Sequence, residues 1–288
     1  MLQLIVSALT AGSTLALPAM GLTLTYRLLG FPNFAYGDLM AVGAYVAFGL
    51  QVRLGMSLGR AFLIAMPLTM LTTVGLDCLW FRPLRRRHAP RVILAVSSLG
   101  LGLFIRHVLS LVWGQQPLSY PYVFEGSAAV PGLPLPLSQR QVLAVSLMLI
   151  LAPIVSLLRG STKWGKAMRA TVDSRHLALI SGIDIERVVL YSWLPAGALA
   201  AAGGMLVGLQ GGLYPEMGWD MLIAIFAATF LGGLGSLTGA ILGALTVGTA
   251  QELSTLLPLP AYKPAVSLVI LVCALLMQRP AQLRKDVS

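Results

Sequence analysis

Residues 141–158 read Q-V-L-A-V-S-L-M-L-I-L-A-P-I-V-S-L-L, a continuous run without a single charged side chain. A helix of roughly 20 apolar residues crosses the ~30 Å hydrocarbon core of a bilayer. The run lacks the period-2 alternation of a transmembrane β-strand, and a helix satisfies all its backbone hydrogen bonds internally, as the bilayer interior demands. This stretch therefore predicts a membrane-spanning helix.

Similar runs recur along the whole chain. The sequence is 57% hydrophobic and 10% charged, whereas soluble domains carry about 25% charged residues. No basic stretch precedes the first apolar run, so we expect a retained span there and not a cleaved signal peptide. The segment 221–231 is too short to cross alone; either it continues into the glycine-rich stretch that follows or it forms a half-helix. We predict one domain over 1–288, an all-α polytopic integral membrane helical bundle with eight or nine spans. The candidate spans are 2–24, 32–50, 61–80, 92–113, 141–158, 188–209, 221–231, 239–257 and 265–279.

The basic residues are divided unevenly between the two sides of this bundle. Loops on the cytoplasmic side of a membrane are enriched in Lys and Arg. Fifteen of the twenty basic residues lie in the loops 25–31, 81–91 and 159–187 and in the tail from Arg279, whereas the opposite loops carry four. We therefore expect those loops and the C-terminus in the cytoplasm. The net charge of +10 reflects this orientation, and we predict no binding to nucleic acid.

Two of the loops are long. The loop 114–139 contains five prolines and no basic residue before Arg140, which predicts a turn-rich segment outside the membrane. The loop 159–187 is charged, and its apolar residues at helical spacing predict a helix from Lys166 to Ile180. This helix either lies on the lipid headgroups or docks onto a cytoplasmic partner.

Glycines at spacings of four are concentrated late in the chain. Such spacing lets two helix backbones approach closely, so we predict helix packing at these positions. The residues are Gly204, Gly208, Gly212, Gly235, Gly239 and Gly243.

The sequence contains only incomplete versions of motifs for catalysis and cofactor binding. The segment 160–167, G-S-T-K-W-G-K-A, imitates a nucleotide-binding P-loop, but Ala167 replaces the hydroxyl that holds magnesium and a span precedes it in place of a strand. The serine and histidine residues form no credible protease dyad, and the three histidines and two cysteines are too scattered for a metal site. We expect no enzymatic activity, no cofactor and no metal on this chain.

Polar residues at membrane depth are expensive and usually functional. Asn33, Tyr36 and Asp38 stand at the start of the second span, where Pro32 and Gly37 predict a turn or a broken helix. We predict that these three polar residues belong to a translocation path or gate, while Asp38 alone is also explained as the cap of a helix N-terminus.

Other acids have different predicted roles. We expect Asp77 to form a local ion pair with Arg82 and Glu252 to face an internal cavity. Glu216 and Asp220 lie in an acidic outer loop and are candidates for contact with an extracytoplasmic partner.

Six segments together resemble LivH-type permeases, the membrane subunits of ABC importers for branched-chain amino acids. Residues 21–30, G-L-T-L-T-Y-R-L-L-G, and 33–45, N-F-A-Y-G-D-L-M-A-V-G-A-Y, carry the first part of the likeness. It continues in 165–170, 178–184, 201–206 and 226–240, so that it covers nearly the whole chain.

The resemblance implies a location in a bacterial inner membrane and a set of partners. These are a second related, LivM-like permease, two ATPase subunits that hold ATP and magnesium, and a periplasmic substrate-binding protein. It also implies that the loop 159–187 is the segment that couples to the ATPase, with Arg169, Asp173, Ala178 and Gly182 as candidates. Many ABC importers carry an E-A-A-x3-G signature there, of which only Ala178 and Gly182 remain in this chain.

The resemblance favours import of branched-chain or other hydrophobic amino acids, with urea or short amides as alternative solutes. The competing class is an autonomous secondary transporter or channel. Such proteins often contain paired broken helices near the midplane, and the stretches Pro32–Asp38 and Pro215–Asp220 are faintly alike, with spacings that differ by one.

Overall fold

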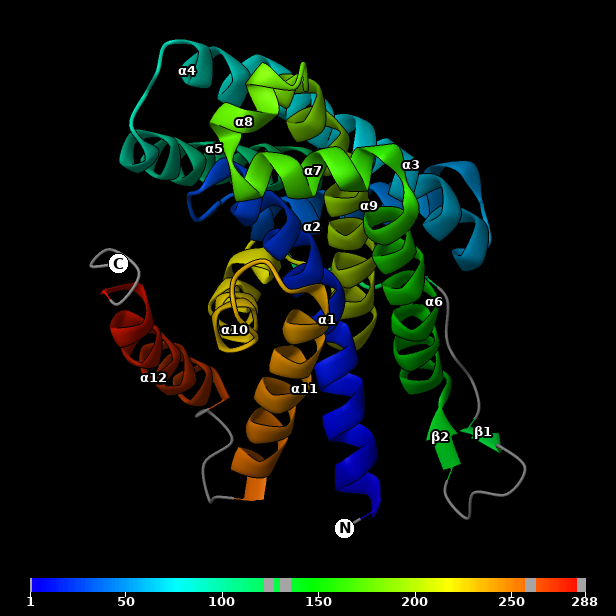
Figure 1. The fold of residues 1–288 in the computed structure, drawn as a ribbon. Coiled ribbons are helices and arrows are strands. Elements are labelled where there is room, and N and C mark those ends of the chain that lie inside the picture. The colour runs from blue at the N-terminus through cyan, green and yellow to red at the C-terminus, as the bar shows by residue number, and fades with distance from the viewer. Residues whose placement is uncertain (1, 122–126, 130–135, 257–262, 284–288) are drawn as a thin grey trace.

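The computed structural model describes residues 2–121, 127–129, 136–256 and 263–283 (Figure 1). Parts of the predicted loop 114–139, the end of the predicted span 239–257 and the basic tail beyond 283 therefore lie outside the described residues.

Each predicted span coincides with a helix, which confirms the all-helical bundle. Two three-residue strands, paired antiparallel with Ser127 opposite Ser138, are the exception within the loop 114–139. The elements are α1 (Leu2–Leu29), α2 (Tyr36–Leu54), α3 (Leu58–Leu76), a π-helical turn (Asp77–Phe81), α4 (Arg82–Arg86), α5 (Arg91–Trp113), β1 (Ser127–Ala129), β2 (Pro136–Ser138), α6 (Gln139–Ser161), α7 (Lys163–Asp173), α8 (Arg175–Ile180), α9 (Ile185–Gly211), α10 (Met217–Leu231), α11 (Leu237–Leu253), a 3-10 turn (Ser254–Leu256) and α12 (Lys263–Leu283).

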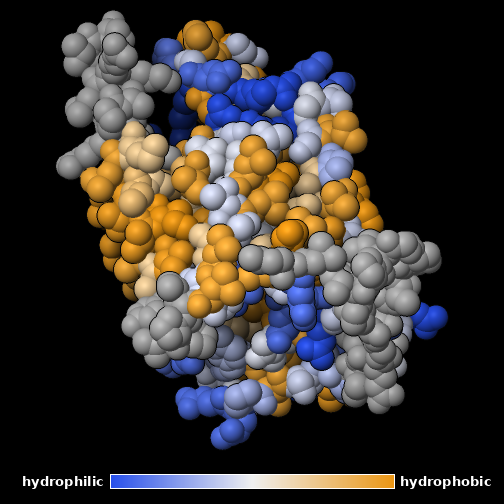
Figure 2. Space-filling model, turned by 90° about the horizontal axis from the view of Figure 1, so that it is seen from below, coloured by the Kyte–Doolittle hydropathy of each residue, from blue (hydrophilic) through white to orange (hydrophobic). Residues whose placement is uncertain are grey.

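Five described helical segments are long and apolar enough to cross a membrane, and two shorter apolar helices, 217–231 and 263–277, accompany them. The surface in Figure 2 shows an orange apolar band between two blue polar margins. Such a band is what a protein surrounded by lipid presents to the hydrocarbon core.

The segment 221–231 belongs to the short helix α10, which begins four residues earlier and ends at Leu231. It does not continue into the glycine-rich stretch, because Gly233 and Gly235 adopt positive φ angles of 85° and 92° and turn the chain toward α11. Of the two predicted alternatives, the structure therefore shows the short helix.

Helix α9 lies at the centre of the bundle and packs against α1, α2 and α3. Its glycines make this packing possible: a Cβ atom at Gly203 would lie 2.7 Å from the Pro18 side chain, and one at Gly204 would collide with the Met40 carbonyl. Without a hydrophobic force between helices in lipid, close backbone contact of this kind supplies the attraction.

Four of the six predicted packing glycines contact another part of the chain from within a helix: Gly204, Gly208, Gly239 and Gly243. The prediction is wrong for Gly212 and Gly235, which lie outside the helices with φ of 85° and 92°. A spacing of four does not reveal where a helix ends, and both glycines lie in turns beyond a helix end.

We predict that Gly204→Ala lowers stability and Gly100→Ala does not. The added methyl at position 204 meets the Met40 backbone, and overpacking of this kind costs about 1–3 kcal/mol. At Gly100, also inside a helix, nothing lies within 4 Å of the new Cβ atom, so the alanine gains up to about 1 kcal/mol of helix propensity. The thermal unfolding midpoints of the two variants in detergent check this, and equal midpoints would contradict the packing role of Gly204.

Candidate functional site

Helix α2 begins far inside the bundle and not at its edge. The non-helical segment before it runs along α5: Gly30 lies beside Arg91, and the Phe34 amide donates to the Ser98 hydroxyl at 3.0 Å. Asp38, in the first turn of α2, forms an ion pair with Arg106. On α5, Arg106 lies about 22 Å beyond Arg91, at a rise of 1.5 Å per residue. The predicted break between Pro32 and Gly37 is thus confirmed.

A buried ion pair stands at this break. Arg106 Nε lies 3.2 Å from Asp38 Oδ1, and the two side chains are 12% and 1% exposed. The Arg106 guanidinium also stacks 4.8 Å from the ring centroid of Trp219, at the start of α10. Asp38 therefore faces a cation on another helix. Sequence reasoning missed Arg106 and Trp219 as members of this site, although Arg106 is a basic residue inside a predicted span.

Asn33 and Tyr36 are fully buried beside this ion pair. The Asn33 Oδ1 atom accepts a hydrogen bond from the Ala35 amide at 3.1 Å and so shapes the turn that starts α2. Its Nδ2 atom has no hydrogen-bond partner among the described residues. The Tyr36 hydroxyl donates to the Ala196 carbonyl on α9 at 2.9 Å. Both side chains thus hold the break in place.

The two faintly similar stretches of the sequence meet in the structure. A Cβ atom at Gly37 would collide with the Gly218 carbonyl, and one at Gly218 with the Gly37 carbonyl. The first turns of α2 and α10 therefore touch backbone to backbone, next to the pair Asp38–Arg106. Each stretch forms a turn before its helix, closed by the Tyr36 amide on Asn33 O and by the Met217 amide on Tyr214 O.

Glu252 belongs to a separate cavity of about 300 Å³ between α1, α9, α10, α11 and α12. The cavity has apolar walls, among them Leu15, Val207 and Ile223, and a polar rim that includes Asp220, Gln251 and Lys263. Lys263 Nζ lies 2.6 Å from Glu252 Oε1. Opposite charges thus lie at the mouth of an apolar hollow.

The predicted acidic loop reaches the same cavity with one of its two acids. The Tyr214 hydroxyl donates to Asp220 Oδ2 at 3.0 Å, and Asp220 lines the cavity. Burial, and after it this hydrogen bond, raises the pKa of Tyr214 to about 12, so the phenol remains a donor at neutral pH. Glu216 is exposed and does not line the cavity.

The basic loop forms two helices where one was predicted over 166–180. Ser174 separates α7 from α8, because its backbone is extended and its side chain accepts from the Leu177 amide at 3.3 Å. Arg169 turns back toward the end of α6 and donates to the carbonyls of Arg159 and Gly160. Asp173, at the end of α7, is exposed.

Ala178 and Gly182 together end α8. The Ile183 amide donates to the Ala178 carbonyl and the Gly182 amide to the Leu179 carbonyl, both at 3.0 Å, with Gly182 at φ 75°. This pair of hydrogen bonds is a Schellman motif, which needs a left-handed residue, usually glycine, at the position of Gly182. The short helix leaves apolar side chains more than half exposed: Leu177, Leu179 and Ile180.

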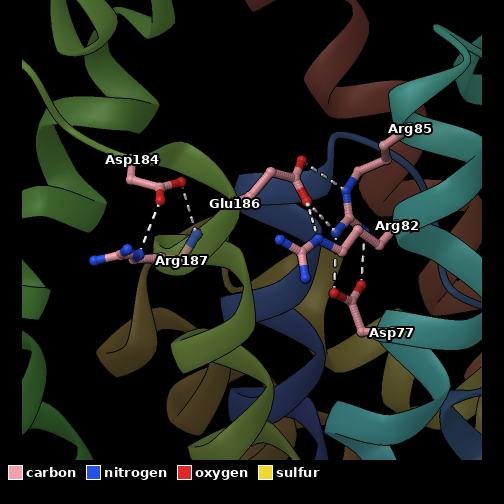
Figure 3. A network of polar contacts seen from close by, with 6 residues as sticks. All are labelled: Asp77, Arg82, Arg85, Asp184, Glu186 and Arg187. Carbon is pink, nitrogen blue, oxygen red and sulfur yellow. Dashed lines mark hydrogen bonds and ion pairs between the residues drawn. The ribbon is translucent and has the colours of Figure 1, made fainter.

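An ion-pair network joins this loop to the end of α3 (Figure 3). Arg85 forms a bidentate pair with Asp77, with distances of 2.6 and 2.9 Å, and its Nη2 lies 3.0 Å from Glu186 Oε2 at the start of α9. A local ion pair of Asp77 was predicted, but the predicted partner Arg82 is wrong: Arg82 contacts Glu186, at 3.6 Å. The π-helical turn Asp77–Phe81 changes which side chains share a face with Asp77.

Within the described ranges, no group of three or more His, Cys, Asp and Glu side chains is placed to hold a metal ion. Long apolar helices with ion pairs buried between them indicate an integral membrane protein, in which charged groups at depth are usually functional.

Comparison with known sequences identifies the family. Residues 4–275 match the family model of the permease component of branched-chain amino acid transport systems. The high-affinity branched-chain amino acid transport system permease protein LivH of Escherichia coli K12 is 29% identical, over 96% of this chain and 93% of LivH. The probable branched-chain amino acid transport permease protein LivH of Methanocaldococcus jannaschii is 31% identical, over 94% of this chain and 88% of its own.

The chain therefore belongs to the family of branched-chain amino acid transport permeases. Among solved structures, PsaBC from Streptococcus pneumoniae in complex with Fab aligns with a TM-score of 0.48 at 14% identity, over 93% of this chain and 89% of that one.

We predict that Arg85→Gln destabilises the fold far more than Arg187→Gln. Loss of Arg85 leaves Asp77 buried and unpaired, and breaking a buried pair costs about 3–5 kcal/mol. The matched pair Arg187–Asp184, also in Figure 3, is 78% and 51% exposed, so its loss costs about 0–1 kcal/mol. Thermal unfolding of the two variants in one detergent measures the difference. Similar midpoints for both would mean that the network does not hold α3 to α9.

Proposed function

We propose that this chain is the membrane-spanning permease subunit of a bacterial ABC importer. It forms the translocation path for branched-chain or other hydrophobic amino acids and carries no catalytic group of its own. The observation that carries this proposal is the family match over residues 4–275. Two relatives from distant organisms bear names of this same transport, which supports the choice of substrate class.

In this proposal the whole chain is one permease domain in the inner membrane. It crosses eight or nine times, depending on whether α10 traverses the bilayer. The end that carries α4, α7 and α8 faces the cytoplasm, as does the C-terminus, because the basic loops gather there.

The translocation path opens alternately to the two sides of the membrane. Partners and substrate drive this change by binding one conformation more tightly than the other, without covalent chemistry. The path passes the break before α2, where Asn33, Tyr36 and Asp38 lie beside Arg106. The cavity of Glu252 and Asp220 opens toward the outer side, where its apolar walls suit an aliphatic side chain. Exposed Glu216 and the cavity rim at Asp220 meet the periplasmic binding protein.

The remaining partners are a second, LivM-like permease and two ATPase subunits, which bind ATP and magnesium. The helix α8 docks onto an ATPase through its exposed apolar residues Leu177, Leu179 and Ile180. Arg169 anchors α7 on the end of α6, exposed Asp173 faces the partner, and Ala178 with Gly182 fixes the shape of the docking turn.

Transport by the purified assembly tests this function. Affinity purification from native membranes should recover ATPase subunits with the chain, and proteoliposomes of the assembly should take up radiolabelled leucine only with ATP and binding protein. A panel with valine, urea and acetamide assigns the solute class.

The meeting of α2 and α10 inside the bundle also suits a secondary transporter with paired broken helices. The chain alone in liposomes under a proton or sodium gradient is therefore the decisive control. Uptake in that arm would overturn the importer assignment.

We predict that Gly182→Val uncouples ATP hydrolysis from uptake, whereas Gly182→Asn preserves coupling. A Cβ atom at position 182 meets nothing within 4 Å, so the effect comes from the φ of 75° and not from a collision. A β-branched residue is strained there by about 1–3 kcal/mol, while asparagine tolerates this conformation. The number of ATP molecules hydrolysed per leucine transported measures coupling. Normal coupling in Gly182→Val would exclude α8 as the docking helix.

A further inference from the structure

A second hollow, of about 400 Å³, lies at the basic end of the bundle and plays no part in the proposed path. Three arginines from three helices line it: Arg27 at the end of α1, Arg159 near the end of α6 and Arg169 in α7. Residues 235–238, which are the end of the turn after α10 and the start of α11, form another wall.

The positive charges of this hollow have no carboxylate partner. Among the described residues, none of the three arginines takes part in an ion pair, and the polar partners of Arg27 and Arg169 are backbone carbonyls. Arg159 makes no side-chain hydrogen bond with a described residue, although it is only half-exposed. By contrast, Arg82, Arg85, Arg106, Arg187 and Lys263 all face a carboxylate.

The start of α11 adds polar groups to the hollow. Ser236 caps α11, and Thr238 stands in its first turn, with its hydroxyl 3.1 Å from that of Ser236. The N-terminus of this 17-residue helix contributes further positive potential. Three guanidiniums and a helix N-terminus around one hollow give it a positive potential, and no carboxylate of the described residues lines it.

We propose that this arginine hollow binds a phosphate group. The planar fork of arginine matches phosphate oxygens, and a tetrahedral anion can face guanidiniums on three sides at once. Arg27 and Arg159 lie at the ends of two spanning helices, which is the depth of the lipid headgroups. Basic pockets between spanning helices bind anionic headgroups in this way. The phosphate is that of an anionic phospholipid or of a soluble phosphate.

The test uses the protein purified from native membranes with its associated subunits. Native mass spectrometry counts bound phosphatidylglycerol in the wild type, in Arg159→Gln and in Arg159→Lys. Equilibrium dialysis of radiolabelled inorganic phosphate, in nanodiscs of phosphatidylcholine alone, measures the soluble source. Arg87→Gln is the matched control, since Arg87 is an exposed arginine at the same end of the bundle without a place in the hollow.

We expect Arg159→Gln to reduce binding of one probe about tenfold, Arg159→Lys to lie between it and the wild type, and Arg87→Gln to match the wild type. The probe affected identifies the source, lipid or soluble phosphate. Equal binding of both probes by all four proteins would overturn the proposal. Loss of the ATPase subunits from Arg159→Gln with unchanged binding of both probes would overturn it too, because an acidic partner surface would then fill the hollow. Equal unfolding midpoints of Arg159→Gln and Arg87→Gln show that the fold is intact.

Discussion

Contact between helix backbones at glycine is the constraint on which the rest of this bundle depends. In lipid the apolar side chains gain nothing by leaving one apolar medium for another, so close approach and its dispersion energy must hold the helices together. The contact of Gly37 with Gly218 brings the first turns of α2 and α10 within touching distance. This contact in turn places Trp219 over Arg106. A larger residue at either glycine would separate the aromatic ring from the charge.

Some charges inside this fold are paired with an opposite charge and others are not. At the break before α2 and at the end of α3, each buried carboxylate has an arginine within 3.2 Å. The attraction within such a pair offsets the free-energy cost of removing both charges from water only when the hydrogen-bond geometry is good. Here both pairs lie on helices whose positions are set by glycine contacts. The three arginines around the second hollow lack this compensation. The phosphate group proposed for this hollow reduces the repulsion among them.

The sequence predicted most of the fold but fewer of the contacts. Apolar runs located the long helices of the described ranges, since bilayer thickness dictates their length, and proline with glycine located the break before α2. The partner of Asp38 could not be found, because Arg106 is 68 residues away and periodicity within one helix says nothing about its neighbours. The partner of Asp77 was misassigned because a π-helical turn has no sequence signature. Ser174 could have indicated the start of a second helix, since serine favours the N-cap position. The apolar residues at helical spacing on both sides of it predicted one continuous helix instead.

The length and position of α9 connect two distant parts of the chain. It starts three residues after Gly182, and near its far end Gln210 and Gly211 line the cavity of Glu252, about 40 Å away. Midway, Pro195 removes one hydrogen bond from the helix, and the adjacent Ala196 carbonyl accepts a hydrogen bond from Tyr36. One helix without an intervening loop therefore joins the Gly182 turn to the wall of the cavity, and its middle is attached to the break before α2.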